Sequence, residues 1–207
     1  MKQIRFVIFG LGFAAFAFCF LDHPLSSFIH SCPWVAELHN EFVSVFGALG
    51  HGMGVLAIGA TIYVLDETNR RKIPRLLACA FLPGLVVGIV KLFVCRIRPR
   101  EFDFGFGIYD SVLGVFPFHS LSSNFQSFPS GHSATGFGLA VGLSWLYPKG
   151  KSLFFAFAVL ITWQRIVSES HFLSDTICGA ILGIIISRLC LYNCQRSNFA
   201  DDIEKGK

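Results

Sequence analysis

Long apolar stretches constrain this chain more than any other feature of its sequence. Of its 207 residues, 53% are hydrophobic and 14% are charged, with a mean hydropathy of +0.60, whereas about 25% of the residues of a typical soluble domain are charged. A helix needs roughly 17–25 apolar residues to cross a hydrocarbon core about 30 Å thick. Six stretches approach or reach that length, over residues 4–21, 44–65, 76–95, 130–147, 152–168 and 172–193. The sequence therefore predicts an all-α membrane protein with six transmembrane helices in one bundle.

Little chain remains for a separate soluble domain, so we expect one integral-membrane domain over residues 1–207. The first stretch follows Lys2 and Arg5 and has no evident cleavage pattern, which favours a membrane anchor over a signal peptide. Residues 33–46 carry large apolar side chains at near-helical spacing, which is typical of a helix lying in the membrane interface. The segment between Arg100 and Phe128 is rich in phenylalanine, and we expect it to lie at the interface, where it either anchors the chain or covers a site.

Basic residues predict the orientation of the bundle. Most of them flank the stretches on one side, and the positive-inside rule makes that side, with both termini, cytoplasmic. The exceptions fall on the opposite side and are Lys91, Arg96, Arg98, Arg100 and Arg165. Each alone is compatible with a side chain reaching from a helix end to the interface. We expect a bacterial inner-membrane protein whose site faces the periplasm.

The densest group of polar residues in an apolar setting is Arg165, His171 and Asp175. Charge in such a setting is costly unless it has a partner or a ligand. If Asp175 follows His171 on a helix, their i, i+4 spacing lets the carboxylate contact one ring nitrogen and fix the tautomer. This pattern predicts an imidazole prepared to act as a nucleophile.

A second motif opens the fourth stretch, where Ser130, Gly131 and His132 follow Pro129. Ser130 suits a helix N-cap, and the free N–H groups of a first helical turn bind anions. Guanidinium groups match phosphate oxygens, and a second imidazole can protonate a leaving oxygen. The predicted topology places all these residues at the outer end of the bundle. Together they indicate phosphoryl transfer, with attack by His171 and proton donation by His132.

The order and spacing of three motifs resemble the type 2 phosphatidic acid phosphatase superfamily, in particular its bacterial membrane lipid phosphatases. The motifs are Lys91-x6-Arg98-Pro99, Pro129-Ser130-Gly131-His132 and Arg165-x5-His171-x3-Asp175. The resemblance implies a phosphatase without metal or cofactor, with His171 as nucleophile, Asp175 as its orienting residue and His132 as general acid. It also implies a phosphate site formed by Lys91, Arg98, Ser130, Gly131 and Arg165. Gln164 departs from the pattern, because the family usually has Ser there, and we expect it to change geometry or substrate preference.

The predicted activity is hydrolysis of a lipid phosphate monoester or diphosphate at the outer face through a phosphohistidine. Candidate substrates are undecaprenyl diphosphate, phosphatidylglycerophosphate, phosphatidate and lipid A phosphate, and the expected partners are this lipid and the bilayer, with no nucleic acid. Two alternatives stay open: a lipid phosphotransferase that uses an acceptor other than water, and a non-catalytic protein that binds lipid or anions. A zinc site formed by His132, His171, Asp175 and Glu169 is disfavoured, because the neighbouring cations repel a divalent ion.

Overall fold

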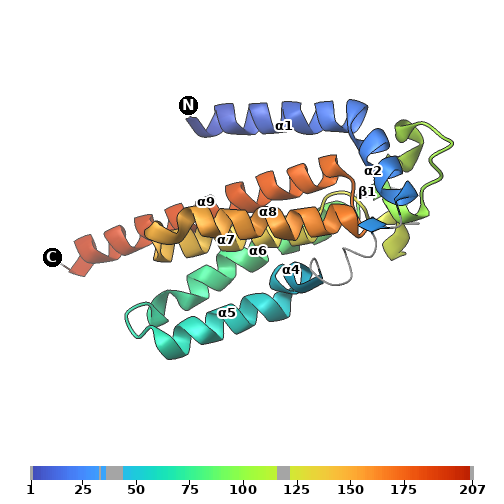
Figure 1. Ribbon diagram of the computed structural model, residues 1–207. Coiled ribbons are helices and arrows are strands. Elements are labelled where there is room, and N and C mark those ends of the chain that lie inside the picture. The colour runs from blue at the N-terminus through green and yellow to red at the C-terminus, as the bar shows by residue number, and fades with distance from the viewer. Residues whose placement is uncertain (1, 33, 36–43, 116–121, 206–207) are drawn as a thin grey trace.

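Helices account for most of the described chain and form an elongated bundle (Figure 1). The computed structural model describes all residues except 1, 33, 36–43, 116–121 and 206–207. The α-helices are α1 (Lys2–Phe20), α2 (Asp22–Ser31), α4 (Ser44–Leu49), α5 (Gly52–Leu65), α6 (Ile73–Lys91), α7 (Gly131–Leu146), α8 (Lys151–Val167) and α9 (Leu173–Lys205). Short 3-10 helices are η2 (Arg70–Lys72), η3 (Pro99–Glu101), η4 (Ile108–Ser111), η5 (Ser123–Phe125) and η6 (Pro148–Gly150).

Helix α7 lies at the centre, in contact with α6, α8 and α9. Glycines let its backbone approach its neighbours closely: a Cβ on Gly138 would lie 2.3 Å from the Cys79 carbonyl oxygen of α6. A Cβ on Gly183 of α9 would lie 2.4 Å from the Ala134 carbonyl oxygen of α7. Small residues at such contacts are typical of helices that pack within a membrane.

Three described helical segments are long and apolar enough to cross a membrane, namely Arg70–Lys91, Pro148–Val167 and Leu173–Tyr192. The pair Ile4–Phe20 and Asp22–Ser31, bent by 55°, makes a fourth if it is one span. These lengths, measured on the described residues, agree with an integral membrane protein. The stretch predicted over 44–65 is interrupted, because α4 ends at Leu49 and α5 begins at Gly52.

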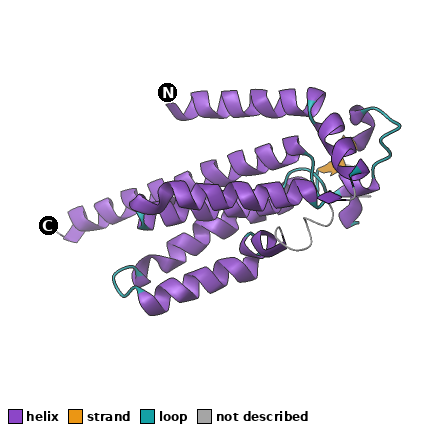
Figure 2. Ribbon diagram, viewed as in Figure 1, coloured by secondary structure: helices purple, strands orange, loops and turns teal. Residues whose placement is uncertain are grey.

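The prediction of an all-α chain with a helix over 76–95 was wrong at one place. Helix α6 ends at Lys91, and the following residues form strand β1 (Val94–Arg96), which pairs antiparallel with β2 (Val112–Val115). Figure 2 shows this small sheet at one end of the bundle. Valine suits a strand, and Arg98 before Pro99 disfavours helix. A hydropathy window does not distinguish such a short apolar strand from the end of a helix.

The phenylalanine-rich segment after Arg100 is only partly a surface feature. Phe102 is 6% exposed and forms a buried cluster with Ile108 and Phe172, so it packs in the core rather than at the interface, while Phe106 is 60% exposed. The helix predicted over 33–46 lies mostly outside the described residues.

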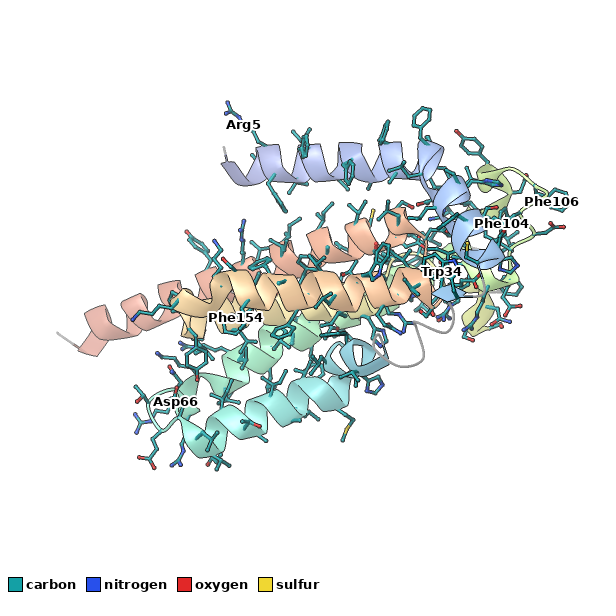
Figure 3. The ribbon with its side chains drawn as sticks, in the orientation of Figure 1. Arg5, Trp34, Asp66, Phe104, Phe106 and Phe154 are labelled. Atoms are coloured by element: carbon teal, nitrogen blue, oxygen red, sulfur yellow. The ribbon has the colours of Figure 1, made fainter. Side chains whose placement is uncertain are left out.

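Both chain termini lie at the end of the bundle that is farther from the sheet (Figure 1). Figure 3 shows Arg5 and Asp66 at that end, and Trp34, Phe104 and Phe106 at the other. One end of the bundle therefore carries both termini and the other end carries the sheet. The predicted site residues lie at the end that holds the sheet.

Candidate active site

The predicted site residues come from helix ends on one side of the bundle. Lys91 is the last residue of α6, and Arg165 lies in the last turn of α8. Ser130 is the N-cap of α7, and His171 precedes the first turn of α9. Segments far apart in sequence are thereby brought to one place.

His171 lies in the short connection between α8 and α9. Its backbone N–H donates to the Arg165 carbonyl oxygen over 3.2 Å, and the residue is 3% exposed. Its ring atom Nδ1 lies 2.5 Å from the carbonyl oxygen of Ser127. A carbonyl oxygen only accepts hydrogen bonds, so this contact requires a proton on Nδ1. The neutral ring then carries its free electron pair on Nε2.

The predicted hydrogen bond between the Asp175 carboxylate and the His171 ring is not formed in the described structure. One carboxylate oxygen accepts from Ser127 Oγ over 2.6 Å and from the Phe172 N–H over 2.9 Å, and the other accepts from Arg96. Within the described part of the chain, no hydrogen bond joins the Asp175 and His171 side chains. The reason is where α9 begins: His171 precedes the helix, so the two residues are not one helical turn apart. Asp175, in the first turn, instead reaches back to the N–H that precedes the helix, as in half of a capping box.

Two of the predicted phosphate-binding arginines hold unused hydrogen-bond donors. The Nε atoms of Arg98 and Arg165 are buried and have no hydrogen-bond partner among the described residues. A buried donor left unpaired costs roughly 1–3 kcal/mol. An oxyanion between these side chains would accept from both and remove that cost.

The neighbours of these cations fix where they lie. Lys91 Nζ donates to the carbonyl oxygen of Gln126. Gln164, at the position that departs from the family pattern, is buried, and its side-chain oxygen accepts from Arg165 Nη1 over 3.2 Å. Gln164 therefore contacts one nitrogen of the guanidinium, while Nε has no hydrogen-bond partner among the described residues.

The start of α7 supplies the second motif. Ser130 Oγ accepts from the Ser133 N–H over 3.4 Å, as an N-cap does, and the Ser130 N–H donates to the Asp175 carbonyl oxygen over 3.0 Å. The second and third motifs are therefore joined through backbone. The His132 ring lies 6.1 Å, between centroids, from the ring of His51. The positive end of α7 suits an anion beside these residues.

Burial and neighbouring charge keep His171 neutral. Burial has the larger effect in lowering its pKa well below the ordinary value of 6.5, and the cations Lys91, Arg165 and Arg98 add to it. The hydrogen bond with the Ser127 carbonyl acts in the opposite direction. A neutral imidazole among fixed cations suits attack on a group that carries negative charge.

Sequence reasoning missed three polar residues beside the site. Arg96 is 2% exposed and donates to both Asp175 and Asp22. We had noted Arg96 only for its side of the membrane, and no local pattern connects Asp22 or Ser127 with the motifs.

Glu169, which we had considered as a zinc ligand, contacts His30 Nδ1 over 2.6 Å. Among the described residues, no group of three or more His, Cys, Asp or Glu side chains is arranged to hold a metal ion.

Comparisons with known proteins found similar sequences and similar structures. The family model described as PAP2 superfamily matches residues 73–199, more than half of the chain. A relative named lipid A 1-phosphatase from Rhizobium johnstonii is 33% identical over 107 residues, which are 51% of this chain and 41% of the relative. The chain thus matches less than half the length of that relative.

Two solved structures share the fold. Aquifex aeolicus LpxE is 26% identical with a TM-score of 0.62, over 83% of this chain and 95% of that one. A PAP2-type phosphatidylglycerolphosphate phosphatase from Bacillus subtilis is 20% identical with a TM-score of 0.62, over 94% of this chain and 96% of that one. The second likeness supports the fold alone.

Proposed function

Since the chain belongs to the PAP2 superfamily, we propose that it is an integral-membrane lipid phosphatase that works through a phosphohistidine. One observation carries this proposal. A buried histidine, fixed with its proton on Nδ1, is surrounded by the charges of three cations, and two of these are arginines whose buried Nε donors lack a partner in the described part of the chain. Such a site suits the binding of a group with several negatively charged oxygens.

In the first step, Nε2 of His171 attacks phosphorus, and the bond between phosphorus and the lipid oxygen breaks. His132 gives its proton to that leaving oxygen, and the dianionic substrate favours the protonated form of His132. Lys91, Arg98 and Arg165, with the N–H groups of the α7 first turn, stabilise the charge on the equatorial oxygens. We assign this phosphate site to Lys91, Arg98, Ser130, Gly131 and Arg165, as the sequence predicted.

In the second step, a water oxygen attacks phosphorus and the P–N bond breaks. His132, now neutral, takes a proton from that water, and inorganic phosphate leaves. Asp175 acts through Ser127, whose carbonyl keeps the proton of His171 on Nδ1. No step requires a metal ion or a cofactor.

The apolar surroundings favour a lipid over a soluble phosphate ester. A cavity of about 440 Å³ is lined almost wholly by apolar side chains of α4, α5, α7 and α8, including Leu49, Ile58, Leu139, Phe157 and Ile161. Gly136, another lining residue, lies one helical turn after His132. We propose that part of the substrate hydrocarbon chain enters this cavity. Lipid A 1-phosphate is the first substrate to test, because a curated relative is named for it. The other three candidates complete the panel.

We propose that all six predicted stretches cross the membrane, with α4 and α5 together as a broken second span. Helix α7, with 16 residues, is about 24 Å long, and its neighbours in the bundle bury much of it. The flanking basic residues favour a bacterial inner membrane with both termini cytoplasmic and the site periplasmic. This arrangement places the cationic site at the level of lipid phosphate groups.

The experiment is phosphate release by the purified protein in detergent with EDTA present. The substrates are lipid A, undecaprenyl diphosphate, phosphatidylglycerophosphate and phosphatidate. We expect release from at least one lipid, and a loss of roughly a thousandfold or more in His171→Ala. The matched control is His23→Gln, since His23 contacts the Phe104 carbonyl oxygen outside the site.

Four results would contradict this proposal. Turnover that needs added metal would contradict the metal-free mechanism, and turnover that survives in His171→Ala would contradict the nucleophile. Transfer of phosphate to an added alcohol in preference to water would instead favour the phosphotransferase. If no lipid is hydrolysed but phospholipid still binds, the non-catalytic alternative gains support.

A further inference from the structure

Helix α2 lies outside the residues matched by the family model, yet its first residue contacts the third motif. Asp22 is fully buried, and its Oδ1 accepts from the Ser174 N–H over 2.9 Å. Its Oδ2 accepts from Ser174 Oγ over 2.5 Å. Ser174 lies in the first turn of α9, where backbone N–H groups have no partner within the helix. Asp22 therefore caps α9 from another helix.

Arg96 joins Asp22 to the carboxylate of Asp175. Its Nη2 lies 2.8 Å from Asp22 Oδ2, and its Nη1 donates to Asp175 and, over 2.8 Å, to Ser174 Oγ. The guanidinium carbon also lies 4.1 Å from the ring centroid of Phe172. A planar guanidinium that is bonded in several directions and covered by an aromatic ring is restricted to one orientation. Because Arg96 has one orientation, the Asp175 carboxylate that it contacts is also fixed in position.

The connection continues to the His171 ring in two steps. Asp175 accepts from Ser127 Oγ, and the Ser127 carbonyl oxygen contacts His171 Nδ1. A shift of Asp175 would move Ser127, and with it the carbonyl that fixes the tautomer of His171.

A second contact joins α2 to the connection between α8 and α9. His30, in the last turn of α2, lies 2.6 Å from Glu169 through Nδ1. Glu169 has a φ of 50°, in the left-handed region. Helix α2 thus contacts Glu169, in the connection between α8 and α9, and Ser174, in the first turn of α9, on the two sides of His171 in the sequence.

We propose that Asp22 is a positioning residue for phosphoryl transfer: through Arg96 and Ser174 it fixes Asp175, and thereby keeps His171 in the Nδ1-protonated form. This inference rests on the proposed function, in which His171 is the nucleophile. Asp22 touches neither substrate nor reacting atoms, so its loss should affect the rate of chemistry more than substrate binding.

The first test is the steady-state kinetics of Asp22→Asn. We expect kcat to fall by about 10–100-fold, with KM and the inhibition constant of inorganic phosphate changed by less than about threefold. The matched control is Asp66→Asn at the opposite end of the bundle, where the carboxylate contacts Tyr147 and Asn69. We expect its kcat to equal that of the wild type.

A double variant tests whether Asp22 acts through Arg96. If it does, Asp22→Asn combined with Arg96→Met loses little more activity than Arg96→Met alone. Wild-type kcat in folded Asp22→Asn would overturn the proposal. So would additive losses, or a loss of phosphate affinity as large as that of kcat.

A spectroscopic measurement separates this proposal from the proposed function. With ¹⁵N-labelled histidine, the wild-type spectrum should show His171 with its proton on Nδ1, and Asp22→Asn should show a mixture of tautomers. No substrate is needed, so the result decides the inference even if none of the lipids is hydrolysed. If Asp22→Asn does not fold, Ser174→Ala, which keeps all charges, replaces it. An unchanged His171 tautomer in the variant would overturn the proposal.

Discussion

At the scale of single residues, the proposed function depends on hydrogen-bond donors that lack acceptors among the described residues. Arg98 and Arg165 keep buried Nε atoms without partners in the described chain, whereas Arg100 at the surface contacts Asn124 and Glu101. Burial thus distinguishes Arg98 and Arg165, which we propose bind the ligand, from Arg100, which forms contacts at the surface.

Replacing Arg98 should therefore affect activity far more than replacing Arg100. We expect Arg98→Met to lose about 10²–10³-fold in kcat/KM, because a preorganised donor to the transition state is removed. Arg100→Met should stay within about threefold of the wild type, since exposed ion pairs contribute little. Phosphate release in detergent measures both, and equal losses in the two variants would argue against the assigned phosphate site.

The pH profile should report the depressed pKa of His171. The neutral imidazole is the active form of His171, so protonation of His171 should lower kcat/KM only below pH 6.5, apart from the titrations of His132 and of the substrate. Arg165→Gln removes a neighbouring cation, which should raise the pKa of His171 and move the acid limb to higher pH. The substrate titrates equally in both enzymes, so a limb at the same pH in both would contradict this account.

At the scale of elements, close contacts between helices position the motifs. A Cβ on Gly179 of α9 would lie 2.3 Å from the Ser130 carbonyl oxygen, at the start of α7. The absence of a side chain there lets the third motif approach the second. Gly88 of α6 has open space around a Cβ.

Gly179→Ala should separate α7 from α9. We expect a loss of roughly 1–3 kcal/mol of stability from overpacking, together with reduced kcat, because the Ser130 turn must shift. Gly88→Ala should be neutral or slightly stabilising, since alanine favours helix over glycine. Thermal denaturation and phosphate release in detergent check both. A wild-type melting temperature for Gly179→Ala would mean that the two helices can separate without cost.

At the scale of the whole molecule, the two ends of the bundle differ in charge and in role. Most basic residues between the predicted stretches lie toward the end of the bundle that carries both termini (Figure 1), whereas Arg96, Arg98 and Arg100 lie with the candidate site at the other end. A lipid phosphatase needs its site at the level of the phosphate groups, and the orientation that we propose for the bundle would give the candidate site that position.

The orientation predicts the behaviour of reporters fused to the C-terminus. In a bacterial host, green fluorescent protein fused after residue 207 should fluoresce, because that end is expected to be cytoplasmic. Alkaline phosphatase at the same point should be inactive, since it folds in the periplasm. The opposite pair of results would place the site on the cytoplasmic side.

The sequence by itself indicated a membrane protein and predicted the chemistry that we propose for its site. Apolar length indicated a membrane bundle, and the residues within each motif indicated phosphate chemistry, because both signals depend on residues close together in the chain. It did not predict the end of α6 at Lys91 or strand β1, since short apolar segments suit helix and strand alike.

Only the tertiary structure decided how His171 is oriented. The spacing of His171 and Asp175 suggested a direct hydrogen bond, but α9 begins between them, and the Ser127 carbonyl takes that place. Asp22 and Arg96 are 74 residues apart in sequence and meet only in the folded chain. Helical spacing describes contacts between neighbours on one helix. A buried charge needs a partner in the folded chain, and that partner can come from any segment packed beside it, so no local sequence pattern predicts the pair.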